Sequence, residues 1–122
     1  MVNQSTDSHA ISISNSTVQG QVGQTLTNCT SIINAQPKGE KKALLEALQK
    51  DVRALIERLP EEKKLEVADD LKMVVDQATA ETPNRKWYSV SSQGLLEAAK
   101  WAGDFTTSIT GTVGRLTKLV IP

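Results

Sequence analysis

Apolar residues recur at spacings of three and four along residues 39–80, the pattern of amphipathic helices. The pattern divides at Leu59-Pro60, because proline cannot continue the first helix comfortably but suits the first turn of a second. The first apolar stripe contains Leu44, Leu45, Leu48, Val52, Leu55, Ile56 and Leu59, and the second contains Leu65, Ala68, Leu71, Val74, Val75 and Ala78. Two such stripes can bury each other across a short joint, so we predict an antiparallel helical hairpin.

A longer stripe follows Thr82-Pro83, where Thr82 can cap a helix and Pro83 can take its first position. The apolar or small residues of this stripe are Trp87, Val90, Ser91, Gly94, Leu95, Ala98, Ala102, Phe105, Ile109, Val113, Leu116 and Val120. Gly103-Asp104 offers an interruption, with Asp104 able to cap a last helix. The stripe could form one long helix, but we favour two helices that are nearly collinear or kinked.

The N-terminal part of the chain has a different pattern. Ile11-Ser12-Ile13-Ser14 and residues 17–23 alternate between apolar and polar or small residues, which is the period of a half-buried strand. Residues 25–34 return to helical spacing. We therefore predict a flexible tail at 1–10, an uncharged β-prone segment and short helix at 11–37, and a helical bundle at 38–122. The alternative for the β-prone segment is a disordered polar tail.

The fold class predicted from these patterns is mostly α, an antiparallel helical bundle with a short β-prone N-terminal segment. The chain has 122 residues and a formal net charge of +0, so net charge gives no strong signal for nucleic acid. Asp7 is the one charged residue before Lys38. The sequence shows neither the order of a signal peptide nor an apolar run of ~18 residues. A soluble cytoplasmic protein is expected.

No catalytic constellation, cofactor site or metal site is expected. Cys29 and His9 are each the single residue of their type, and Cys29 falls on the apolar side of its helix, where a small buried hydrophobe is the expected role. Glu66, Asp69, Asp70 and Asp76 are expected to form an ordinary solvated face. We therefore expect no enzyme.

An interface is the best-supported kind of site. An uncharged strand with unpaired edges invites pairing with another copy, and exposed small residues let a second backbone approach. The candidate interface residues are Ile11, Ile13, Val18, Val22, Trp87, Trp101, Gly103, Phe105, Ile109 and Gly111. We expect a homo-oligomer, with another protein as the alternative partner.

Two other functions are compatible with the sequence. The amphipathic stretch 95–121 would suit a membrane-acting helical protein, although core packing is favoured for it. Basic residues stand beside aromatic ones, a combination that can bind a small ligand or a nucleotide, at Arg85, Lys86, Trp87 and Tyr88, with Trp101 further along.

The order of these segments resembles a bacterial module that is common in cyanobacteria. The similarity runs from about Ile11 onward, and its most specific pieces are Thr82-Pro83-Asn84 and Ser92-Gln93-Gly94-Leu95. Such modules occur alone or at the end of multidomain signalling and defence-type proteins. The resemblance implies an accessory or self-associating role. The function expected is a non-enzymatic oligomerisation or protein-interaction module.

Overall fold

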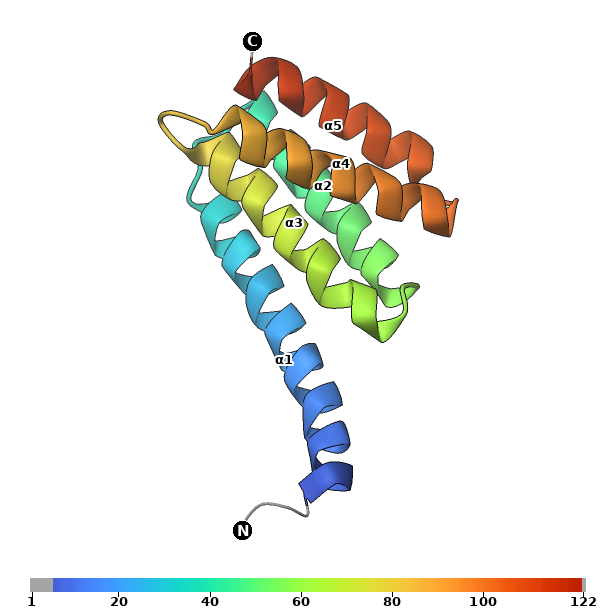
Figure 1. Ribbon diagram of the computed structural model, residues 1–122. Helices are drawn as coiled ribbons and strands as arrows, with labels where there is room; N and C mark the ends of the chain where they lie inside the picture. The colour runs from blue at the N-terminus through green and yellow to red at the C-terminus, as the bar shows by residue number, and fades with distance from the viewer. Residues whose placement is uncertain (1–5, 122) are drawn as a thin grey trace.

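The computed structural model describes residues 6–121, with side chains from Val18 onward, and this part of the chain contains five helices and no strand (Figure 1). The helices are α1 (Thr6–Asn34), α2 (Glu40–Glu57), α3 (Glu61–Thr79), α4 (Arg85–Ala102) and α5 (Thr106–Val120). The predicted class, a mostly α helical bundle, is confirmed.

Helices α2 to α5 run alternately up and down and form a four-helix bundle (Figure 1). Helix α3 packs against α4, α4 against α5, and α5 against α2, which closes the ring. Helix α1 lies outside this ring and packs mainly on α3, with a smaller contact to α2. The predicted hairpin at Leu59-Pro60 is present, with α3 beginning one residue after the proline.

One hydrophobic core joins all five helices. The apolar stripes of α2 and α3 face inward, as their spacing predicts, and Val22, Leu26, Cys29 and Ile33 of α1 are buried with them. The side chain of Gln49 on α2 donates hydrogen bonds to the Leu26 carbonyl and to Thr30 Oγ1, which ties α1 to α2.

The predicted β-prone segment is helical, so the strand interpretation of Ile11-Ser12-Ile13-Ser14 and residues 17–23 is wrong. Val18 and Val22 stand four residues apart and continue the buried stripe of Leu26, Cys29 and Ile33. The helical register places this stripe against α3, whereas a strand would leave its backbone groups unpaired. Within the predicted tail at 1–10, residues 1–5 lie outside the described part of the chain, and the helix already begins at Thr6.

The predicted break at Gly103-Asp104 is present, but the collinear arrangement is wrong. Helix α5 folds back antiparallel on α4, because Gly103 adopts φ +87° and reverses the chain. Asp104 pairs with Arg58 instead of capping α5. At the other end of α4, Asn84 serves as the cap in place of Thr82, since its side chain accepts a hydrogen bond from the Trp87 N–H at 3.0 Å.

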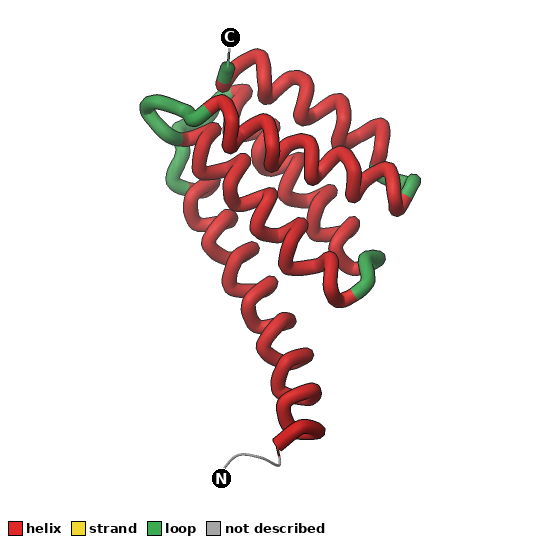
Figure 2. Tube along the Cα trace, viewed as in Figure 1, coloured by secondary structure: helices red, strands yellow, loops and turns green. Residues whose placement is uncertain are grey.

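The N-terminal half of α1 projects beyond the rest of the bundle (Figure 2). Val18 is partly buried against the core, and the groove beside α3 includes Gly20 and Leu65. Helix α3 begins at Glu61, only four residues before Leu65, so the preceding turns of α1 extend past the end of α3. We call residues 6–17 the α1 extension.

Candidate functional site

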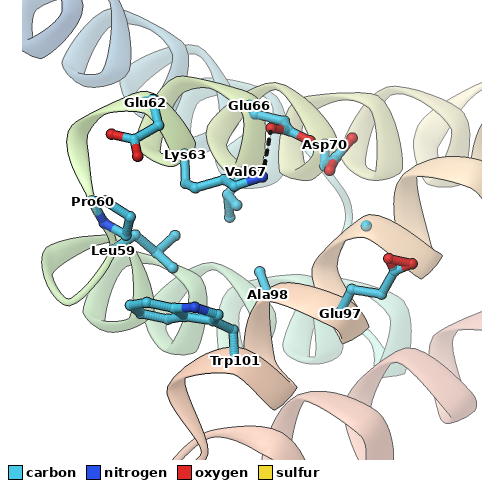
Figure 3. Close-up of a pocket in the computed structure, with 11 residues that line it drawn as sticks. Leu59, Pro60, Glu62, Lys63, Glu66, Val67, Asp70, Glu97, Ala98 and Trp101 are labelled. Atoms are coloured by element: carbon cyan, nitrogen blue, oxygen red, sulfur yellow. Dashed lines mark ion pairs between the residues drawn. The ribbon is translucent and has the colours of Figure 1, made fainter.

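A partly enclosed groove lies between α3 and α4 (Figure 3). It holds about 370 Å³, and a second hollow continues it along α4 toward Val90. The two hollows share Glu66, Asp70, Gly94 and Glu97, so they form one continuous α3–α4 groove. Its lining residues are Leu59, Pro60, Glu62, Lys63, Glu66, Val67, Asp70, Ser89, Val90, Gln93, Gly94, Glu97, Ala98 and Trp101.

Gly94 sets how closely α3 and α4 approach in the middle of the groove. A Cβ atom on Gly94 would lie 2.2 Å from Oδ2 of Asp70. Because glycine has no side chain, the Asp70 carboxylate occupies that space beside α4. The Asp70 carboxylate therefore lies in the groove beside Gly94. A larger residue at position 94 would displace this carboxylate.

The electrostatics of the groove are dominated by carboxylates. The pKa of Asp70 is raised from 3.8 to about 6, mainly by burial and then by the negative charges of Glu66, Asp69 and Glu97. Of the groove-lining side chains that the structure describes, Lys63 is the single cation, and its Nζ lies 3.8 Å from Glu66 Oε2. The prediction of an ordinary solvated face fails at Asp70, because α4 covers part of this carboxylate.

Large apolar side chains are exposed along α4. Trp101 is 65% exposed and stands beside Leu59 at one end of the groove (Figure 3). Val90, which is 64% exposed, lines the other end. Trp87, 54% exposed, follows one turn beyond Val90. Residues 87, 90, 94, 98 and 101 are spaced by three and four, so they share one helix face. Ala98 of this face packs against the core, whereas its large apolar residues Trp87, Val90 and Trp101 remain exposed.

Sequence reasoning missed the groove because it assigned the apolar residues of α4 to a single core-facing stripe. The buried residues of α4 are Tyr88, Ser91, Ser92, Leu95 and Ala99, whereas Trp87, Val90 and Trp101 are exposed. The signal was present, since the apolar and small residues of this helix cover a wider arc than one core contact needs.

The predicted interface residues are dispersed over the molecule. Val22 and Ile109 are buried in the core, with Val18 and Phe105 packed against it, so these four are structural within one chain. Gly103 forms the α4–α5 turn, and Gly111 is exposed on α5, where an added Cβ atom would meet nothing within 4 Å. The side chains of Ile11 and Ile13 lie outside the described set. Trp87 and Trp101 are the exposed aromatic members.

The structure does not assemble the aromatic residues into one stacking platform. Tyr88 is buried, and its hydroxyl lies 2.9 Å from Thr117 Oγ1 on α5. Burial raises the pKa of this phenol. Trp87 and Trp101 are both exposed, but fourteen residues of helix separate them by about 21 Å. The basic and aromatic corner around Trp87 therefore contributes a single exposed ring.

The apolar face of the C-terminal stretch is used within the bundle. Ile109, Val113, Leu116 and Val120 of α5 are buried, and Leu119 is the exposed large apolar residue of this helix. Among the described residues, no helix combines the length and the apolar character needed to span a membrane.

Cys29 is a buried free thiol, as its place on the helix predicts. Burial raises its pKa from 9.0 to about 11, which keeps the sulfur protonated near neutral pH. Among the described side chains, no group of three or more His, Cys, Asp or Glu residues is arranged to hold a metal ion.

Comparison with known protein families, with curated proteins and with solved structures gives no match for this chain.

Proposed function

We propose that this protein is a non-enzymatic interaction module that self-associates through the N-terminal part of α1. The observation that carries the proposal is that the α1 extension projects beyond the bundle, where no other helix of the described residues lies beside it (Figure 2). The chain's resemblance to modules at the ends of bacterial signalling and defence-type proteins supports the same role. We include a cytoplasmic location, with which the single free cysteine agrees.

The composition of the α1 extension supports a partner. Asp7 is its one charged residue, and Ile11 to Thr17 are all β-branched, serine or asparagine, which are weak helix formers. An isolated helix of this length is marginal in water even for good formers. A helix here is therefore best stabilised by packing against another molecule.

Helical register identifies the residue most suited to that contact. Ile11 precedes Val18 by seven residues and Val22 by eleven, so it continues the stripe that α1 presents to α3. Ile13 is out of register with this stripe. From Ile11 onward this stripe carries no charged residue, although Asp7 stands in the same register one turn earlier. A second copy offers the same stripe, and two copies can pair symmetrically.

Two single substitutions in the full chain test the proposal. We expect a defined oligomer by light scattering after size exclusion, which Ile11→Lys converts to monomer. The matched control Ile13→Lys places the same charge off the stripe and is expected to retain most of the oligomer. A monomeric unsubstituted chain at about 100 µM, or equal loss in both variants, would overturn self-association along this stripe.

A further inference from the structure

We propose that the α3–α4 groove binds a basic amphipathic helix of about three turns from a partner protein. The proposal concerns a different surface from the α1 extension and does not depend on self-association.

The dimensions of the groove favour a short helix. It extends along α4 from Val90 to Trp101, eleven residues or about 16 Å. An amphipathic helix of three turns covers this length and can place apolar side chains at positions i, i+3 or i+4, and i+7. Its neighbours would be two existing helices, α3 and α4, which is the geometry by which helices add to a bundle.

Apolar anchors stand at both ends of the groove. Trp101 and Val90 expose more than half of their surfaces, and Leu59, Val67 and Ala98 line the hollow beside Trp101. Exposed tryptophans in such positions are typical centres of binding energy. A bound helix that covers Trp101 would bury apolar surface that is exposed to solvent in the isolated chain.

The acidic side chains of the groove favour a partner helix with positive charge. Glu62, Glu66, Asp70 and Glu97 line the groove, with Lys63 as the single opposing charge. Asp70 is held partly buried beside Gly94 with these like charges around it. Lysine or arginine side chains flanking the apolar face of a bound helix would relieve this repulsion, whereas an acidic helix would increase it.

The test uses the fluorescence of Trp101. The chain has two tryptophans, so Trp87→Phe leaves Trp101 as the sole emitter. The probe is an acetylated 14-residue helical peptide with leucine at positions 4, 7, 8 and 11 and lysine elsewhere on its flanks. One control peptide replaces lysine with glutamate, and another replaces leucine with serine. We expect a blue shift of the Trp101 emission and a Kd below 100 µM for the first peptide alone.

Substitutions on the protein distinguish binding in the α3–α4 groove from non-specific electrostatic attraction between the basic peptide and acidic side chains elsewhere. Glu66→Lys with Glu97→Lys should weaken binding at least tenfold, and Trp101→Ala should do the same in calorimetry. Glu46→Lys changes an exposed charge on α2 and should change the Kd less than twofold, and Ile11→Lys should leave it unchanged. Circular dichroism confirms that each variant is folded.

Each of three results with the peptides would overturn the proposal: no binding of the leucine–lysine peptide at 1 mM, equal binding of the serine peptide, or equal weakening by Glu46→Lys. A concentration-dependent blue shift without peptide that Glu97→Lys abolishes would identify a second copy as the occupant and would also overturn it.

Discussion

At the scale of single residues, Asp70 is the side chain whose environment departs most from what its type suggests. It lies on the polar side of α3 by spacing, yet α4 approaches closely enough at Gly94 to shield it from water. No pattern in α3 alone indicates this, because the approach depends on a missing side chain in another helix.

The raised pKa of Asp70 predicts a pH-dependent cost in stability. Its carboxyl titrates near 3.8 when unfolded and near 6 when folded, so the folded state is penalised progressively as pH rises between these values. We expect Asp70→Asn to raise the free energy of unfolding at pH 7.5 by about 1 kcal/mol, a value that allows for solvent screening of a partly exposed group. At pH 4 the gain should nearly vanish.

Urea denaturation of both proteins at the two pH values measures this difference. Glu46→Gln removes an exposed carboxylate on α2 and serves as the control, with little change expected at either pH. A gain for Asp70→Asn that is equally large at pH 4 would contradict the assignment.

At the scale of elements, local pattern predicted α2 and α3 well and α1 poorly. The stripes of α2 and α3 are long and regular, so their pairing needs no other information. In α1 the alternation around Ile11 and Ile13 competes with the four-residue spacing of Val18, Val22 and Leu26. Contact with the bundle favours the helical period at Val18, Val22 and Leu26, and a single segment cannot reveal that contact. The turns around Ile11 and Ile13 continue the same helix beyond the end of α3.

The α4–α5 turn shows the same limit. Gly103 and Asp104 indicate a break, but the direction of the following helix depends on the core it joins. Burial of Ile109, Val113 and Leu116 against the bundle requires α5 to reverse. A collinear helix would leave these side chains in water.

Two glycine substitutions distinguish the contribution of the α4–α5 turn to stability from that of helix α5. Gly103→Ala places a side chain at φ +87° and should reduce the free energy of unfolding by about 1–2 kcal/mol. Gly114→Ala lies in open space within α5 and should increase it by up to about 1 kcal/mol through helix propensity. Thermal and urea unfolding of both variants provide the measurement. A gain in stability for Gly103→Ala would show that the turn relaxes to another conformation.

At the scale of the whole molecule, the sequence predicts a helical bundle but not its boundary. The charge pattern suggests that the bundle starts at Lys38, yet Val22, Leu26, Cys29 and Ile33 belong to its core. The uncharged segment before Lys38 contributes buried residues to the core. The rise in charge density at Lys38 therefore does not mark the start of the folded bundle. The groove likewise needed the packing of α3 against α4 to become visible.

Two truncations check where the folded unit begins. Removal of residues 1–17 should change the melting temperature by less than about 3 °C, because the first described side chain packed on the core is Val18. Removal of residues 1–37 should lower it by at least 10 °C or prevent soluble expression, since it uncovers the α1-facing side of α3. Equal stability of the two products would mean that α1 is not part of the core.

The length of the α1 extension also determines how far apart the bundles of two paired copies would lie. Residues 6–17 of a continuous helix span about 18 Å. Two copies joined along this rod would hold their bundles apart and leave both α3–α4 grooves open to solvent. A ligand protein carrying two suitable helices would then bind both copies at once, and its avidity would follow from the length of the rod as much as from the chemistry of either groove.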